Sequence, residues 1–179
     1  MIEDIQTVLI TEKEIKKRVK ELGKQISKDY KGKDLVLISV LKGGSVFLAD
    51  LMRAITIPVT IDFMAILSYG PSTESLGVVK IVKDLEESIS EKDVIVVEDI
   101  VDTGLTLNYL TRNLKSREPA SLEICSLLDK SVRRIANIPI KYKGFEVPDV
   151  YLVGYGLDYV QVYRNLPFIG ELKPSIYAE

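Results

Sequence analysis

Residues 94–107 read VIVVEDIVDTGLTL, and this stretch decides the fold that we expect. The β-branched run Val94–Val97 indicates a buried strand, and Leu107–Leu114 has a helical composition. Between the two lie three carboxylates and a Thr-Gly-Leu-Thr segment. Because α/β proteins bind ligands where a strand ends and a helix begins, the stretch predicts a binding site.

The polar loop between this strand and this helix suits a phosphate group. The first backbone N–H groups of a helix have no partners within it, so they can bind an anion. Gly104 lets the backbone approach a ligand closely, and the hydroxyls of Thr103 and Thr106 add donors. The adjacent acids Glu98 and Asp99 would repel a phosphate, so we expect them to hold a ribose diol or Mg²⁺ instead.

The shorter motif, an acid followed by Thr-Gly after a strand, is often only the N-cap of a helix. The whole stretch is more specific, because two acids follow the apolar run and two apolar residues separate them from Asp-Thr-Gly-Leu-Thr. It resembles the phosphoribosyl diphosphate signature of the type I phosphoribosyltransferase family. The resemblance implies that Glu98 and Asp99 bind the ribose hydroxyls. The loop that would wrap the 5′-phosphate consists of Thr103, Gly104, Leu105 and Thr106, and Asp102 before it belongs to the same phosphoribosyl-binding group.

Composition places the chain among soluble globular proteins of one domain. It has 179 residues, of which 46% are hydrophobic and 28% are charged. The net charge of −2 argues against a general nucleic-acid binder, because such proteins are usually basic. The acidic start MIEDIQ is not followed by a long apolar run. We therefore expect a cytoplasmic protein with neither a signal peptide nor a membrane span.

The chain contains no histidine, which excludes histidine-based triads, metal sites and acid–base mechanisms. Any general base must therefore be a carboxylate, a lysine, a tyrosine or the lone cysteine. That cysteine, Cys125, lies in the apolar run Leu122–Leu128, so we expect a buried and inert thiol. With a single cysteine, no intrachain disulfide can form.

Alternating strands and helices predict an α/β fold. Thr11 and Glu14 form a capping-box pattern at the start of an amphipathic helix over Glu12–Asp29. Further strands are expected at Leu35–Val40, Pro58–Ile66, Val79–Val82 and Leu122–Leu128, and a further helix at Ser45–Arg53. This order predicts a doubly wound, mostly parallel sheet with flanking helices. We expect one domain over residues 1–179, to which residues 138–179 contribute a small C-terminal cap.

The segment Leu41-Lys42-Gly43-Gly44 follows the first of these strands. Its glycines allow positive φ and expose backbone N–H groups, which can form an anion site, and Lys42 adds positive charge. A purely structural turn is the alternative. The segment resembles the pyrophosphate loop of the family branch that acts on 6-oxo purines. The resemblance implies that Lys42 and Gly43 bind pyrophosphate, and that the Leu41–Lys42 peptide can be cis.

A stretch rich in glycine, serine and threonine runs over Tyr69–Val78. Composition alone predicts a mobile surface loop. The stretch also resembles the flexible catalytic loop of the family, which closes over the site and excludes water. The resemblance implies that Ser68 and Tyr69 contact pyrophosphate.

A lysine follows the expected strand Leu122–Leu128, and it has two interpretations. On general grounds Lys130 is a solvated side chain. The family resemblance implies instead that Lys130 donates a hydrogen bond to the 6-oxo group of a purine. Its neighbour Asp129 stands where some relatives have an apolar residue.

An aromatic and glycine-rich segment near the C-terminus reads YLVGYGLDY from Tyr151. It can form a plain strand and turn, and it also resembles the base-binding segment of the family. The resemblance implies that Tyr151 stacks on the purine, Leu152 offers backbone groups to the base edge, and Asp158 binds Mg²⁺ through waters. The remaining tyrosines, Tyr155 and Tyr159, are expected to pack.

The resemblance as a whole implies a reaction. Phosphoribosyl diphosphate and hypoxanthine or guanine would give IMP or GMP and pyrophosphate. Asp102 would act as the general base toward the purine N7, and Arg164 would contact the pyrophosphate. Mg²⁺ would bridge oxygens of the pyrophosphate and the ribose beside Glu98, Asp99 and Asp158.

Two other functions stay open at this point. One is a transferase that prefers xanthine, because the residues do not rank hypoxanthine, guanine and xanthine. The other is an RNA-binding regulator that retains the phosphoribosyl site, although the acidic charge and the intact purine segment disfavour it. Because members of the family form dimers and tetramers, a homodimer or homotetramer is expected.

Overall fold

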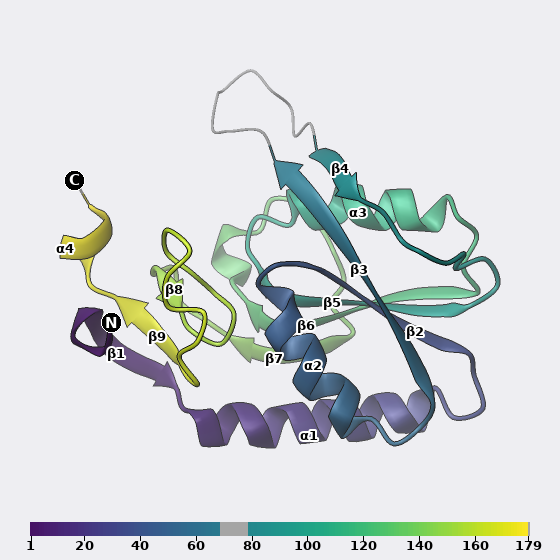
Figure 1. The fold of residues 1–179 in the computed structure, drawn as a ribbon, viewed down its shortest axis with the longest axis horizontal. Helices are drawn as coiled ribbons and strands as arrows, with labels where there is room; N and C mark the ends of the chain where they lie inside the picture. The colour runs from purple at the N-terminus through teal and green to yellow at the C-terminus, as the bar shows by residue number, and fades with distance from the viewer. Residues whose placement is uncertain (69–78, 179) are drawn as a thin grey trace.

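The computed structural model describes residues 1–68 and 79–178, which form two β-sheets and flanking helices (Figure 1). The larger sheet has six strands in the order β4-β3-β2-β5-β6-β7, and the smaller has three in the order β1-β9-β8. The stretch Tyr69–Val78, for which the sequence predicts a catalytic loop, lies outside the described residues.

The larger sheet confirms the predicted fold class. Its strands are β2 (Leu35–Leu41), β3 (Val59–Ser68), β4 (Val79–Lys83), β5 (Asp93–Val101), β6 (Ser121–Asp129) and β7 (Tyr142–Glu146). Every neighbouring pair is parallel except β3 and β4, which are antiparallel. The result is a doubly wound, mostly parallel sheet.

Helices cover both faces of this sheet. They are α1 (Glu12–Asp29), α2 (Gly44–Ala54) and α3 (Leu105–Lys115), with a short α4 (Pro174–Tyr177) at the end of the chain. The helices α1 and α2 pack on one face, and α3 packs on the other (Figure 1). Among the described residues, no helix is both long and apolar enough to cross a membrane.

The strand β5 is buried on both sides, and this explains its continuous apolar run. Ile95 and Val97 belong to the core under α1 and α2, whereas Val94 and Val96 belong to the core under α3. A strand whose two faces are both covered needs apolar residues at every position rather than at alternate ones.

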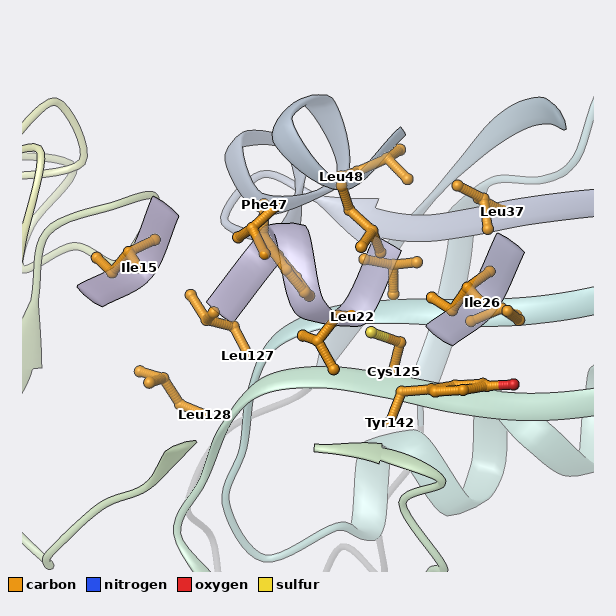
Figure 2. Close-up of a cluster of buried hydrophobic side chains, with 14 of the residues drawn as sticks. Ile15, Leu22, Ile26, Leu37, Phe47, Leu48, Cys125, Leu127, Leu128 and Tyr142 are labelled. Carbon is orange, nitrogen blue, oxygen red and sulfur yellow. The ribbon is translucent and has the colours of Figure 1, made fainter. Parts of the chain in front are cut away.

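Figure 2 shows the core under α1, where side chains of Leu22 and Ile26 meet those of the sheet. Cys125 from β6 is fully buried and unpaired there, as predicted, and burial raises the pKa of its thiol. Tyr142 from β7 is also buried, and its hydroxyl donates to Asp29 at 2.9 Å. The helix is thereby fixed to the edge of the sheet.

The N-terminal capping box of α1 is confirmed. The hydroxyl oxygen of Thr11 accepts a hydrogen bond from the Glu14 N–H at 3.3 Å, and the Glu14 carboxylate accepts one from the Thr11 N–H at 2.8 Å. Two N–H groups that a helix start leaves unpaired are thus satisfied.

The smaller sheet joins the two ends of the chain, as Figure 1 shows. It consists of β1 (Ile5–Ile10), β8 (Leu152–Val153) and β9 (Ile169–Leu172). The sequence pattern predicts no strand before Thr11, but β1 pairs antiparallel with β9. The sheet therefore anchors the segment that carries Tyr151, because the Leu172 N–H donates to the Tyr151 carbonyl at 2.8 Å.

The strand β5 is longer than predicted. It continues to Val101, so Glu98 and Asp99 lie within the strand rather than after it. The reason is its pairing with β6, which extends to Val101 opposite Asp129. The helix α3 begins at Leu105 and not at the predicted Leu107.

Candidate active site

The carboxyl ends of β2 and β5 meet where the sheet changes its winding direction. The strand β2 leads through α2 to β3 on one side, and β5 leads through α3 to β6 on the other. The two strands are direct neighbours, with Ser39 opposite Val97. Loops that leave neighbouring strands in opposite directions open a crevice, and α/β proteins bind ligands in such crevices.

Two adjoining hollows occupy this crevice, with volumes of about 660 Å³ and about 180 Å³. Ile100 and Asp102 line both of them, so the hollows meet at the end of β5. The larger is also lined by Lys42, Gly43, Asp99, Lys130, Arg133, Asp149, Val150, Tyr151, Leu152, Leu157, Asp158, Arg164 and Tyr177. The smaller is also lined by Val40, Ile66, Glu98, Val101, Thr103, Gly104, Thr106 and Leu107.

Most of the predicted site residues therefore come together. Leu105 is the first residue of α3 and lines neither hollow. Ser68 is the last residue of β3. Tyr69 lies outside the described residues.

The acid pair on β5 is strongly affected by burial. Desolvation, followed by the neighbouring charge of Asp99, raises the pKa of Glu98 well above its usual range. Burial also raises the pKa of Asp99, although the N–H of Ile100 donates to its Oδ1 at 2.7 Å and opposes the shift. A cation or a pair of hydroxyl donors bound here would favour the charged carboxylates.

The two glycines after β2 lie close to side chains of neighbouring strands, which the sequence does not reveal. Neither Gly43 nor Gly44 uses the positive φ that glycine allows. A Cβ atom at Gly43 would overlap Oδ2 of Asp99, and one at Gly44 would overlap Oγ of Ser39. A side chain at position 43 would therefore displace the Asp99 carboxylate from the loop backbone. The Leu41–Lys42 peptide is cis.

The turn before α3 lines the smaller hollow. Gly104 is the N-cap of α3 and has φ +80°, a conformation that glycine adopts without strain. Asp102 therefore does not cap the helix, and its interpretation as an N-cap is wrong. The Leu105 N–H reaches Oγ1 of Thr103 at 3.4 Å. The other first-turn N–H groups of α3 can bind an anion.

The opposite side of this turn, where its carbonyl groups lie, is held by the segment after β6. The Lys130 N–H donates to the Val101 carbonyl at 3.0 Å. The N–H groups of Ile135 and Ala136 both donate to the Thr103 carbonyl, at 2.9 and 3.1 Å. With its carbonyls bound, the turn can present its N–H groups to a ligand.

A buried ion pair completes this support. The guanidinium of Arg134 donates to the carbonyls of Asp102, at 3.0 Å, and Val101, at 3.3 Å. The same guanidinium binds the carboxylate of Asp129, which is 3% exposed and also pairs with Lys143. Asp129 thus orients Arg134 against the turn.

The Asp102 carboxylate lies where the two hollows meet and pairs with an arginine. Its Oδ1 atom lies 3.3 Å from Nε of Arg133. That oxygen is shielded from solvent and accepts no well-directed hydrogen bond among the described residues. Arg133 also lies 3.7 Å from Oδ1 of Asp149. A ligand that offers a proton at this place would find an acceptor.

Lys130 is buried rather than solvated. Its side chain is 8% exposed, and its Nζ atom donates to the Val150 carbonyl at 2.9 Å. The Asp149 carboxylate lies 3.6 Å from the same nitrogen. An ammonium carries three donors, so Lys130 has a donor left for a ligand in the larger hollow.

Aromatic rings form one side of the larger hollow. Tyr151 is 37% exposed, stacks on Tyr177 at a centroid distance of 4.9 Å, and meets Tyr159 edge-on at 5.5 Å. Tyr155 is buried, and its hydroxyl donates to Asp50 at 2.6 Å. The prediction that Tyr155 and Tyr159 pack is confirmed.

Charged residues from three segments meet at the other end of this hollow. Arg164 pairs with Oδ1 of Asp158 at 2.8 Å and donates to the Gly156 carbonyl at 2.7 Å. Arg164 also lowers, and Asp158 raises, the pKa of Asp99. Lys42, from the loop after β2, lines the same hollow. The arrangement suits a multiply charged anion bound together with a cation.

The three acids predicted to hold Mg²⁺ do not form a metal site by themselves. In the described part of the chain, no three carboxylate or cysteine side chains lie close enough together to hold an ion. Asp99 and Asp158 line the larger hollow and Glu98 lines the smaller. Mg²⁺ keeps several waters and often takes phosphate oxygens as ligands, so this donor set fits an ion bound with its substrate.

Sequence reasoning missed several residues of the site. Arg133, Arg134 and Asp149 surround Lys130 and Asp102, and Tyr177 supports Tyr151 from the last helix. The two arginines could have been predicted from the sequence, because they closely follow Lys130 after a strand whose end reaches the crevice. Nothing in the sequence links Tyr177 to the site.

Comparison with known proteins shows similarity to phosphoribosyltransferases over nearly the whole chain. Residues 7–160 match the family model described as a phosphoribosyl transferase domain. A hypoxanthine-guanine phosphoribosyltransferase from Staphylococcus aureus is 52% identical over 178 residues, which cover 99% of each chain. One from Mycobacterium tuberculosis is 52% identical over 180 residues, covering 97% of this chain and 89% of the relative. A crystal structure of a hypoxanthine phosphoribosyltransferase from Staphylococcus aureus has a TM-score of 0.97 and 51% identity, and the match covers 100% of this chain and 97% of that one.

Proposed function

The chain belongs to the phosphoribosyltransferase family, and on this basis we propose that it transfers the 5-phosphoribosyl group of phosphoribosyl diphosphate to hypoxanthine or guanine. The products are IMP or GMP and pyrophosphate. The observation that carries the proposal is the junction of the two hollows at Asp102. One hollow has a phosphate-binding turn and the other has Lys130 beside an aromatic wall, so a phosphoribosyl donor and a purine can meet at this junction.

The smaller hollow binds the 5′-phosphate. The turn over Asp102–Thr106 offers first-turn N–H groups and threonine hydroxyls, and its carbonyls are occupied on the other side. The ribose lies between the hollows, where its hydroxyls donate to Glu98 and Asp99. Support comes from the desolvation of both half-buried carboxylates, which raises their pKa and makes their charged forms costly unless a ligand compensates the charge.

The pyrophosphate lies in the larger hollow, on the backbone of Gly43 and near the cations Lys42 and Arg164. Ser68 and Tyr69 belong to the same binding group in this proposal. Because the leaving pyrophosphate gains negative charge as the bond to the ribose breaks, cations fixed at this end stabilise the transition state.

The purine lies between Lys130 and the aromatic wall. Lys130 donates to the 6-oxo group, Tyr151 stacks on the ring, and the backbone of Leu152 meets the base edge. The low exposure of Lys130 and the partial exposure of Tyr151 support this orientation. In this proposal residues 138–179 contribute the base-binding cap.

Asp102 accepts the proton that the purine loses at N7 as the base bonds to the ribose. No protein nucleophile is needed, since the protein positions two reactants and removes one proton. The position of Asp102 in the lining of both hollows supports this role, and the ion pair of its Oδ1 atom with Nε of Arg133, at 3.3 Å, holds the carboxylate in place.

Magnesium fits the carboxylates of this site when the substrate supplies further oxygens. Asp99 and Asp158 would hold the ion in the larger hollow, with Glu98 beside it. A bound Mg²⁺ supplies positive charge that neutralises the pyrophosphate oxygens. The protein groups around it bind and orient the sugar and the leaving group.

The test is a turnover assay of the purified protein with phosphoribosyl diphosphate, Mg²⁺ and each of four purines. We expect nucleotide from hypoxanthine and guanine and little from adenine. The rate with xanthine, compared with the rates for hypoxanthine and guanine, gives the order of preference among the three 6-oxo purines. An Asp102→Asn protein prepared in parallel controls for a contaminating enzyme. A strong preference for xanthine would correct the substrate, and no nucleotide from any purine would overturn the proposal.

A further inference from the structure

A two-residue hairpin turn, Val160-Gln161, lies next to the larger hollow without lining it. Tyr159 and Val162 pair across the turn through backbone hydrogen bonds of 3.2 and 3.0 Å. The turn residues have φ +49° and +65°, so both are left-handed, as in a type I′ turn.

The residues in this turn are unusual for its conformation. Type I′ turns favour Asn-Gly, and a β-branched residue is disfavoured at positive φ. Val160 is 74% exposed, so core packing does not impose this conformation on it. Residues with strained backbone angles persist where surrounding contacts fix the backbone, and they are frequent at functional sites. In this turn the neighbouring residue Gln161 makes such contacts.

Gln161 contacts three of the residues that line the larger hollow. Its Oε1 atom accepts from Nζ of Lys42 at 3.2 Å and from Nη2 of Arg164 at 3.3 Å. Its backbone N–H donates to Oδ2 of Asp158 at 2.8 Å. One residue thus joins the loop after β2 to the segment that carries Asp158 and Arg164.

The two cations differ in how far they depend on this contact. Arg164 is also held by Asp158 and by the Gly156 carbonyl. Lys42 forms no ion pair within the described part of the chain, and Gln161 is its one side-chain acceptor there. Removal of the amide oxygen would therefore free Lys42 more than Arg164.

The contact orients both cations but leaves their charge uncompensated. A neutral amide oxygen accepts hydrogen bonds without carrying a formal charge. A carboxylate in the same place would compete with an incoming polyanion for the two cations. A glutamine here therefore keeps the positive charges directed and available.

We propose that Gln161 is a positioning residue, which holds Lys42 and Arg164 in place for the pyrophosphate group. The proposal rests on the proposed function, because it takes these two cations as the groups that bind pyrophosphate. The strained turn places the amide oxygen between them. Gln161 itself stays outside the hollow and touches no substrate.

A Gln161→Met variant tests this proposal, because methionine has a similar length and no such acceptor. We expect the KM for phosphoribosyl diphosphate, and that for pyrophosphate in the reverse reaction, to rise about tenfold. The KM for guanine at saturating phosphoribosyl diphosphate and the melting temperature should stay unchanged. The matched control is Gln25→Met, at an exposed position of α1, which should behave as wild type.

A double-mutant cycle identifies the route of the effect. In a Lys42→Met background, Gln161→Met has only its bond to Arg164 left to lose, so its effect on these KM values should shrink to about threefold. Full additivity of the two substitutions would overturn the proposal. The proposal would also be overturned if the single variant Gln161→Met kept the wild-type KM for phosphoribosyl diphosphate. It would be overturned likewise if the guanine KM rose equally and the melting temperature fell.

A direct binding measurement separates this inference from the proposed function. Calorimetry with inorganic pyrophosphate and Mg²⁺ needs no turnover. Weaker binding by Gln161→Met than by wild type supports the positioning role even if the purine substrate differs from the proposed one. Equal dissociation constants would overturn it, whereas absence of nucleotide formation by the wild type would overturn the proposed function alone.

Discussion

The Nε atom of Arg134 donates a hydrogen bond of 3.0 Å to the main-chain carbonyl of Asp102. The turn that we propose for phosphate binding is thus held from behind, by a side chain that lines neither hollow. Asp129 is buried and binds the Nη2 atom of the same guanidinium, which also donates to the Val101 carbonyl. A buried ion pair adds little to the net stability of a protein, although removing one partner destabilises the protein strongly. We therefore infer that this pair serves to orient the turn.

Arg134→Lys tests this orientation. Lysine keeps a positive charge for Asp129 but cannot supply the planar fork that reaches two carbonyls. We expect the KM for phosphoribosyl diphosphate to rise about tenfold, with a similar melting temperature. Arg112→Lys, at an exposed position of α3, is the matched control. An unchanged KM would show that the backbone bonds of the segment alone fix the turn.

The acid pair should act mainly on the sugar. Glu98→Gln together with Asp99→Asn keeps the shape of both side chains and removes their charge. We expect the KM for phosphoribosyl diphosphate to rise about 10²-fold, because charge-assisted hydrogen bonds to the ribose hydroxyls are lost. Steady-state kinetics should show little change in the purine KM at saturating phosphoribosyl diphosphate. The reverse pattern would contradict the assignment of the pair to the ribose.

Asp102→Asn should keep the fold and the binding of both substrates but slow the reaction. An amide cannot take up the proton that leaves the purine N7. Loss of a general base lowers kcat by about 10²–10⁴-fold. Single-turnover measurements are needed, because slow product release can hide the chemical step. An unchanged single-turnover rate would remove Asp102 from this role.

Stability should fall in alkaline solution, in part through Tyr142. Burial, and then its hydrogen bond to Asp29, raise the pKa of this phenol in the folded protein. Its contribution is therefore complete below the unfolded pKa of about 10 and is lost as pH rises above that value, by about 1.4 kcal/mol per pH unit. Denaturant unfolding at several pH values should show a shallower decline for Tyr142→Phe. Tyr109→Phe, at an exposed position of α3, should keep the wild-type slope.

The sequence predicted those parts of the fold whose signal is local. The helix α1 begins and ends as its capping box and apolar spacing indicate. The central strands were visible because burial on both faces requires continuous apolar runs. The acids and the polar turn of β5 followed from their place where a strand ends and a helix begins, whereas Lys42 and Lys130 were assigned only through the family resemblance.

What the sequence could not reveal depends on contacts between distant segments. Gly43 lies against the Asp99 carboxylate, which belongs to another strand. The strand β1 exists because β9 pairs with it. Gln161 contacts Lys42 across a separation of 119 residues, and neither residue carries a sign of the other. Such contacts depend on the tertiary fold, so they cannot be inferred from the sequence pattern around either residue.

The choice among purines should depend on Lys130. Its ammonium has donors only, and it is 8% exposed beside the Val150 carbonyl. Hypoxanthine, guanine and xanthine offer a 6-oxo acceptor, whereas adenine offers a 6-amino donor at the same place. With adenine bound, the ammonium would face a donor in a largely dry pocket and lose a partner, at a cost of about 1–3 kcal/mol or more.

Lys130→Ala should therefore narrow the discrimination between purines. Sites that hydrogen-bond one substrate group can reject an analogue that lacks it by about 10⁴-fold. We expect adenine to be a very poor substrate of the wild type, and kcat/KM to fall far more for hypoxanthine and guanine than for adenine. Lys141→Ala, at an exposed lysine after β6, is a control for the loss of one positive charge. If the ratio of hypoxanthine to adenine stays constant in Lys130→Ala, or if the wild type uses adenine well, base specificity must come from other residues of the larger hollow.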